Sequence, residues 1–366
     1  MIRVEALTKM FTANKETVAA VAGIDFEVGA GEMVTLLGPS GCGKTTTLRC
    51  VAGLEKADGG RIVIGNQTMV DVDAGVFVPP NRRKLGMVFQ SYAIWPHMSV
   101  FDNVAYPLIL RGLGRAEVRE RVARVLDLVG LSGTEARAAT LLSGGQMQRL
   151  ALCRALVYEP DLLLLDEPFS NLDARLREQM RLEVKLLQRR LGITVLFVTH
   201  DQIEALSLSD RIAVIQRGRV EQVGPPRSLY EAPASAFVRD FVGSTVILRG
   251  RVSGQTPGRL TVALDGALRG RHVAGRSMAA IAVGTGAEVH VAIRPEDIEV
   301  DVVRPESEPL PGTIDTLLFV GDRYEARVSL SAEQRIVLLL PRTREWKEGQ
   351  AVSLGLPPDA VSVWPA

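Results

Sequence analysis

The chain has little cysteine. Cys42, Cys50 and Cys153 are the only three in 366 residues. Their number is odd and no two of them are spaced as Cys-x-x-Cys, so the sequence predicts neither a disulfide framework nor a zinc site. We therefore expect the protein to work in a reducing compartment.

Long apolar runs and net charge are also missing. No stretch approaches the roughly 18 apolar residues of a membrane-spanning helix, and residues 1–30 carry scattered charges in place of the apolar centre of a signal peptide. The net charge at pH 7 is only +1. Because no basic field would attract a polyanion, we expect no nucleic-acid partner.

Lysine is scarce among the basic residues, with seven lysines against 36 arginines. Such an excess of arginine is typical of codon bias. Each lysine that remains is nevertheless worth inspecting, and Lys44 is the one that lies inside a recognisable motif.

The length and the pattern of apolar residues predict two domains. Residues 1–240 alternate helical periodicity with short apolar runs, which is typical of buried parallel strands in an α/β domain. Residues 241–366 contain short β-rich stretches punctuated by glycine and proline, so we expect a smaller all-β domain there. The apolar runs of the first domain are Met33–Leu37, Leu85–Phe89, Leu162–Leu165 and Thr194–Val198.

A glycine-rich segment follows the first of these runs and precedes a helical stretch. It fits the pattern G-x-x-x-x-G-K-[ST] and consists of Gly38, Pro39, Ser40, Gly41, Cys42, Gly43, Lys44 and Thr45. Glycines let successive N–H groups turn toward phosphate oxygens at the positive end of a helix. Lys44 would reach the β- and γ-phosphates of ATP, the hydroxyl of Thr45 would bind Mg²⁺, and we include the next residue, Thr46, in the site.

A second buried strand ends in two carboxylates. Asp166 directly follows the run Leu162–Leu165, where it would hold Mg²⁺, and Glu167 comes next as a candidate base for the attacking water. Many strands end in a solvated acidic loop, so the two carboxylates indicate a metal site only in combination with the glycine-rich segment.

The segment Leu142-Ser143-Gly144-Gly145-Gln146 resembles the signature of ATP-binding cassette (ABC) ATPases. Other elements of that family stand in order: Gln90 resembles the Q-loop glutamine, residues 170–173 the D-loop, and His200 the switch histidine. Phe11 stands where the family has an adenine-stacking aromatic residue, usually tyrosine.

The resemblance implies a P-loop NTPase fold, with a RecA-like core and a helical subdomain at about 91–157. It also implies a homodimer or paired cassette. Ser143, Gly144, Gly145 and Gln146 of one cassette would bind the γ-phosphate held by the other, and Asp173 would lie at the same interface. Gln90 would contact the metal or the water, and His200 the γ-phosphate.

The segment that runs from Phe89, directly before Gln90, to Tyr106 contains five aromatic residues, its two end residues included. They predict a groove that receives a helix of a transmembrane permease; packing in the core of the helical subdomain is the alternative.

The surrounding sequence resembles cassettes of bacterial importers for ferric iron, polyamines or phosphonates, and residues 241–366 resemble their OB-like regulatory (TOBE) domain. Such a subunit is peripheral at the cytoplasmic face of the inner membrane and meets the external solute-binding protein only indirectly.

Four other kinds of protein share parts of this pattern. Cassettes of DNA repair insert a very long coiled coil before the signature, whereas here only residues 45–142 separate Lys44 from Ser143. Translation factors of this type usually carry two cassettes, and exporters commonly fuse membrane spans to theirs. A P-loop kinase would explain neither the signature nor His200.

Replacing Lys44 by arginine tests the phosphate site. A planar guanidinium does not replace a compact ammonium between phosphates in a tight loop, so Lys44→Arg is expected to lose ATPase activity although its charge is kept. Steady-state phosphate release measures the outcome. Appreciable activity would show that Lys44 is an ordinary lysine.

Overall fold

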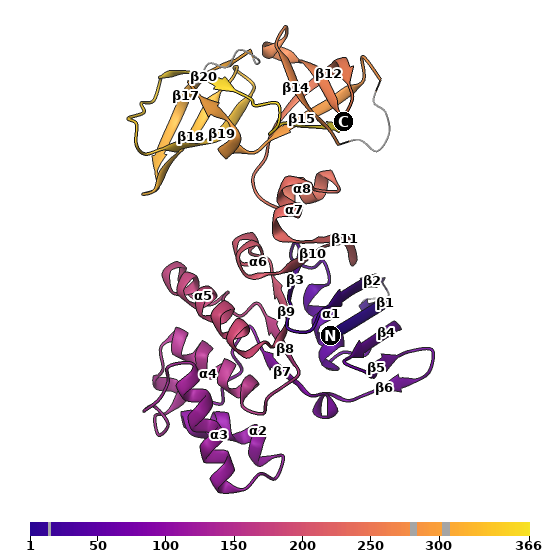
Figure 1. Cartoon of the computed structure of the whole chain (residues 1–366), viewed down its shortest axis with the longest axis vertical. Coiled ribbons are helices and arrows are strands. Elements are labelled where there is room, and N and C mark those ends of the chain that lie inside the picture. Colours follow the sequence, from indigo (N-terminus) through magenta and orange to yellow (C-terminus); the bar gives the residue numbers. More distant parts are fainter. Residues whose placement is uncertain (14–15, 279–283, 302–307) are drawn as a thin grey trace. The chain divides into compact units, whose positions relative to one another are not determined.

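The computed structural model describes residues 1–13, 16–278, 284–301 and 308–366. The chain divides into two compact units, Met1–Val238 and Arg239–Ala366 (Figure 1).

The first unit is built on a six-stranded sheet with the order β11-β10-β3-β9-β8-β7. Neighbouring strands from β10 to β7 are parallel, and only β11 is antiparallel to its neighbour. Every residue of β3, β8 and β9 is buried, which explains why these strands read as continuous apolar runs. The strands are β3 (Met33–Leu37), β7 (Leu85–Val88), β8 (Leu162–Asp166), β9 (Thr194–Thr199), β10 (Arg211–Gln216) and β11 (Arg219–Gly224).

A second sheet of the first unit is antiparallel, with the order β2-β1-β4-β5-β6. The sequence patterns above predict none of its strands, because their burial is irregular and β1 and β2 are interrupted by bulges, so neither a continuous apolar run nor a regular alternation marks them. Helix α1 (Lys44–Ala52) packs its buried Leu48 and Val51 in the same apolar cluster as residues of both sheets. The strands are β1 (Ile2–Ala13), β2 (Glu16–Val28), β4 (Gly59–Ile64), β5 (Gln67–Asp71) and β6 (Val76–Phe77).

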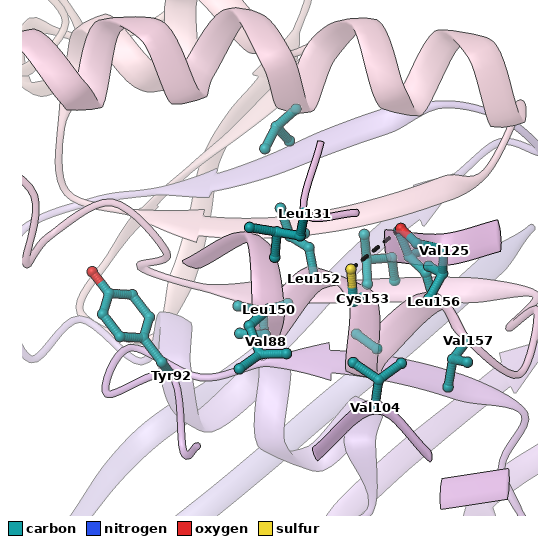
Figure 2. Packing of buried hydrophobic residues seen from close by; sticks show 14 of the residues in the cluster. Val88, Tyr92, Val104, Val125, Leu131, Leu150, Leu152, Cys153, Leu156 and Val157 are labelled. Carbon is teal, nitrogen blue, oxygen red and sulfur yellow. Dashed lines mark hydrogen bonds between the residues drawn. The ribbon is translucent and has the colours of Figure 1, made fainter. Parts of the chain in front are cut away.

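Helices α2, α3 and α4 gather at one end of the first unit (Figure 1). Their apolar faces, together with α5, enclose one core in which Cys153 lies fully buried and donates its thiol to the carbonyl of Val125 at 3.3 Å (Figure 2). Burial raises the pKa of the Cys153 thiol, so it stays a neutral packing group. The helices are α2 (Val100–Ile109), α3 (Arg115–Leu128), α4 (Gly144–Leu156), α5 (Ala174–Leu191), α6 (Gln202–Leu208), α7 (Pro226–Glu231) and α8 (Ala236–Phe241).

The second unit is all-β, as the sequence predicts. One part is a closed barrel, β12-β13-β14-β21-β15, and the other is a five-stranded sheet, β16-β20-β17-β18-β19. Strand β12 alternates buried and exposed residues with a period of two, and a single apolar cluster runs through both parts. The strands are β12 (Val246–Thr256), β13 (Arg259–Leu264), β14 (His272–Ser277), β15 (Glu288–Ile293), β16 (Glu299–Val300), β17 (Leu310–Phe319), β18 (Arg323–Ser329), β19 (Arg335–Pro341), β20 (Ala351–Gly355) and β21 (Ser362–Pro365).

Within the described ranges, none of the helices combines the length and the apolar composition needed to cross a membrane.

Two leucines nine positions apart test the core of the helical part. Leu150 is fully buried on α4, whereas Leu141 is 62% exposed. Leu150→Ala is expected to lower the free energy of unfolding by about 2–5 kcal/mol because it leaves a cavity. The matched control Leu141→Ala should change it by less than about 0.5 kcal/mol. Urea denaturation followed by circular dichroism measures both, and equal effects would contradict this packing.

Candidate functional site

The glycine-rich loop lies at the carboxyl end of β3 and turns into α1. Gly43 has a φ of 104°, and a Cβ there would lie 2.1 Å from the carbonyl oxygen of Ala20. A Cβ on Gly38 would lie 2.3 Å from the carbonyl oxygen of Ile215. These two positions therefore require glycine, and the loop between them, with Ser40 and Gly41 exposed, is forced into a tight curl.

Lys44 folds back over this curl. Its side chain is nearly buried, and Nζ donates to the carbonyl oxygens of Gly38 at 2.7 Å and Pro39 at 2.9 Å. The ammonium thus lies at the mouth of the loop, where an incoming anion would meet it together with the free N–H groups of α1. Burial raises the pKa of the neighbouring Cys42 thiol, which keeps that side chain neutral inside the loop.

Thr45 and Asp166 meet across the sheet edge. The hydroxyl of Thr45 donates to Oδ1 of Asp166 at 3.1 Å, and Thr46 follows on α1, partly buried. Asp166 is only 5% exposed, and burial raises its pKa. In the residues that the structure describes, no group of three or more His, Cys, Asp or Glu side chains could hold a metal ion. A metal at Thr45 and Asp166 would thus need oxygen ligands from a bound anion, which is how Mg²⁺ is commonly held.

Three strand ends converge on Glu167. Nε2 of Gln90, which follows β7, lies 3.3 Å from Oε2 of Glu167, and Nδ1 of His200, which follows β9, lies 3.1 Å from Oε1. Glu167 has a φ of 43°, an uncommon value for a residue with a side chain, and its N–H donates to the carbonyl of Val198. The structure therefore brings together three predicted residues that are far apart in the sequence.

The signature segment forms the start of α4. Ser143 and Gln146 cap the helix reciprocally: the Gln146 N–H donates to Oγ of Ser143 at 3.4 Å, and the Ser143 N–H donates to Oε1 of Gln146 at 3.1 Å. Gly144 and Gly145 make the first turn. In the described part of the chain, no hydrogen bond joins this segment to the phosphate loop, so it does not complete the site of its own chain.

Asp173 and Asn171 lie between β8 and α5. Asp173 caps α5 by accepting from the N–H of Leu176 at 2.9 Å. Asn171 donates from Nδ2 to the carbonyl of Gln90 at 2.8 Å, which fixes the backbone beside the glutamine that approaches Glu167.

Phe11 lies on β1 with 43% of its surface exposed, and the ammonium of Lys9 lies 5.3 Å from its ring centroid. An exposed ring of this kind is free to stack on a flat ligand.

The aromatic segment after Gln90 divides between core and surface. Tyr92 is 7% exposed and belongs to the helical core, so the expectation of a docking groove is wrong for this residue. Trp95 and Tyr106 pack their rings at 4.9 Å, and Tyr106 is 37% exposed. Trp95 is half-buried, so this pair remains accessible to a partner.

Sequence reasoning missed two networks beside the site. Arg154 of α4 donates to the carbonyls of Tyr92 and Ala93. Glu204 of α6 is buried, accepts from the hydroxyl of Thr199 at 2.5 Å and has a raised pKa because of burial. The arginine inside the apolar stretch Leu150–Leu156 could have indicated the first network. No distinctive sequence pattern marks the second.

The comparisons with known proteins agree with this geometry. The ABC transporter family matches residues 21–170, and the TOBE domain family matches residues 291–364. The chain is 46% identical to a ferric iron import ATP-binding protein of Rhizobium meliloti, over 86% of this chain and 84% of that one. It is 39% identical to a spermidine/putrescine import ATP-binding protein of Acidothermus cellulolyticus, over 99% of this chain and 91% of that one.

The chain belongs to the ATP-binding subunits of ABC importers that carry a TOBE domain. A trehalose/maltose import ATP-binding protein of Thermococcus litoralis is 54% identical, but over only 62% of this chain and 61% of its own length. Among solved structures, a dimeric bacterial ABC transporter cassette aligns with a TM-score of 0.55 at 32% identity, over 62% of this chain and 99% of that one. The fold class and the importer ATPase activity predicted from the sequence are thereby confirmed.

Asp166 gives this cassette a stability test. Its raised pKa means that the folded chain disfavours the ionised carboxylate, so stability falls as the pH rises through the raised pKa, and the penalty is present above it. Asp166→Asn should therefore raise the Tm of the nucleotide-free chain by about 2–4 °C, which corresponds to about 1 kcal/mol. The control Asp173→Asn changes an exposed helix cap that asparagine fills equally well, so its Tm should stay the same. Differential scanning calorimetry checks both, and a lower Tm for Asp166→Asn would contradict the burial argument.

Proposed function

We propose that the chain binds and hydrolyses MgATP at a head-to-tail dimer interface and thereby powers solute uptake through a membrane permease. The observation that carries this proposal is the convergence of Gln90 and His200 on the carboxylate of Glu167, next to the phosphate loop of a family whose members are ATPases.

ATP would bind at the curl between β3 and α1. Its phosphates would displace the loop carbonyls as partners of Lys44, and the N–H groups of residues 40–46 would hold the phosphate oxygens. The exposed ring of Phe11 would stack on the adenine.

Mg²⁺ would be held by Thr45, Gln90 and Asp166. The hydrogen bond between Thr45 and Asp166 keeps two of these groups together, and a divalent cation would relieve the cost of the buried Asp166 carboxylate. The metal supplies charge neutralisation for the departing phosphate.

Glu167 would accept the proton of the attacking water. Its left-handed backbone and its two partners hold the carboxylate at one place, and His200 would then contact the γ-phosphate. Gln90 would sense the same phosphate through its contact with Glu167.

A second cassette would complete the site. Within its own chain the segment Ser143–Gln146 caps α4 and offers a helix N-terminus to an external anion. Together with Asp173 it would bind the γ-phosphate held by a partner copy, and the dimeric state of the solved cassette supports this arrangement.

The transported solute is proposed to be a polyamine or ferric iron. The relatives that align over most of the chain are named as importers of these two solutes, whereas the sugar importer aligns over a smaller part. The chain would act peripherally at the cytoplasmic face of the inner membrane, dock a permease near Trp95 and Tyr106, and meet the external binding protein only through that permease. Residues 241–366 would form the regulatory domain, and an exporter or non-transport role has no support among these relatives.

Glu167→Gln tests the chemistry. Removing the base should lower kcat by about 100-fold or more, while MgATP still binds and holds the dimer together. Malachite green phosphate assays and size-exclusion chromatography with MgATP measure the two effects, and Glu183→Gln, on α5, serves as the control. Hydrolysis at the wild-type rate would rule out Glu167 as the base.

ATP-driven uptake by the importer reconstituted in vesicles identifies the solute. Spermidine, putrescine, ferric iron and maltose are tested in parallel. Uptake of maltose alone would contradict the proposed substrate class.

A further inference from the structure

Arg154 is a buried cation on the inner face of α4. Only 8% of its surface is exposed, and burial lowers its pKa. A buried guanidinium is costly unless its donors are paired. Within the part of the chain that the structure describes, no carboxylate lies within ion-pair distance of Arg154, so backbone carbonyls take that place.

The partners of Arg154 are two consecutive carbonyls in an unusual backbone conformation. Nη2 donates to Tyr92 at 2.6 Å and Nη1 donates to Ala93. Tyr92 and Ala93 have φ values of 61° and 48°, and this left-handed conformation carries a free-energy cost for residues with a side chain. The planar fork of arginine spans both carbonyls at once, which offsets that cost.

The same guanidinium also packs on a side chain farther along the segment. It lies 4.7 Å from the ring centroid of Trp95. The backbone of Trp95 is fixed in turn by Asn103, which accepts from its N–H at 2.9 Å and donates to its carbonyl at 3.1 Å. Residues 92–95 are thereby attached to α4 and to α2.

This attachment acts on Gln90, which lies two residues before Tyr92. The N–H of Tyr92 donates to the carbonyl of Phe89 at 2.9 Å, so Gln90 lies inside a closed turn. Asn171 holds the carbonyl of Gln90, and Arg154 holds the residues that follow it. Both anchors therefore restrain the turn from which the amide of Gln90 reaches Glu167.

We propose that Arg154 is a positioning residue for ATP hydrolysis, which fixes the turn of Gln90 to the signature helix and to the surface at Trp95. Arg154 contacts no predicted nucleotide ligand. It lies in the last turn of α4 and joins this helix, whose first turn a partner's γ-phosphate would engage, to the turn that carries Gln90, so that a rigid shift of α4 would also move that turn. The inference rests on the roles proposed above for Gln90 and Glu167.

Arg154→Lys tests whether the two-carbonyl fork is needed. Lysine keeps the charge and most of the length, but its ammonium cannot present a planar fork to both carbonyls. Steady-state ATPase assays of the full chain should show a fall in kcat of about tenfold with the KM for ATP unchanged within about twofold, because the phosphate loop is intact. The control is Arg149→Lys on the same helix, whose arginine pairs with Glu183 and the carbonyl of Val129; it should keep wild-type kcat.

A double-mutant cycle separates positioning from packing. If Arg154 acts through Gln90, then Arg154→Lys should lower kcat by less than about twofold in a Gln90→Ala background, whereas independent effects would multiply. Multiplied effects, wild-type kcat in Arg154→Lys, or a parallel change in KM would each overturn the proposal. If Arg154→Lys does not fold, Arg154→Met replaces it in the cycle, and failure of both to fold would assign Arg154 to packing alone.

Failure of the proposal for Arg154 can be distinguished from failure of the proposed function. If Gln90→Ala lowers kcat and Glu167→Gln abolishes turnover, the proposed function stands and the Arg154 cycle alone decides this inference. If Gln90→Ala retains wild-type kcat, the role of Gln90 falls, and a loss of kcat in Arg154→Lys would then exclude action through that residue.

Discussion

Burial of the parallel sheet on both faces is the constraint on which the rest of the first unit depends. Strands β3, β8 and β9 expose almost nothing, so every polar group that the chemistry needs must lie where these strands end. Because the strands are parallel, their carboxyl ends share one edge. The phosphate loop follows β3, Asp166 is the last residue of β8 and His200 follows β9, so all three lie at this edge.

The polar groups at that edge lower the stability of the folded chain. Asp166 is buried with a raised pKa, Glu167 has a left-handed backbone, and Lys44 uses carbonyls of its own loop as partners. A MgATP ligand would relieve two of these features, since phosphates match the ammonium of Lys44 and a metal matches the carboxylate of Asp166. The strain is thus consistent with a site adapted to its ligand.

The contacts around the edge link elements that belong to different parts of the unit. Gln90 leads from the sheet into the helical part, where Arg154 and Asn103 hold the following residues, and Asn171 holds it from the side of α5. A change at the phosphate site therefore has a short covalent and hydrogen-bonded route to the surface at Trp95 and Tyr106. The signature helix α4 begins at the capping pair Ser143 and Gln146 and carries Arg154 in its last turn, so it would connect the proposed dimer contact to the same surface.

The sequence by itself determined the parallel strands, the phosphate loop and the family, because these depend on local patterns: continuous apolar runs, glycines at fixed spacing, and a short signature. It also determined the all-β character of the second unit, although not its division into a barrel and a sheet. The antiparallel sheet of β1, β2 and β4–β6 was not predicted, since its registers are interrupted by bulges and β1 pairs with β4 across a long stretch of sequence. Only the tertiary structure decided that Tyr92 packs inside, that Gln90 and His200 reach one carboxylate, and that Arg154 holds two strained carbonyls, because these facts depend on which surfaces the folded chain buries against each other.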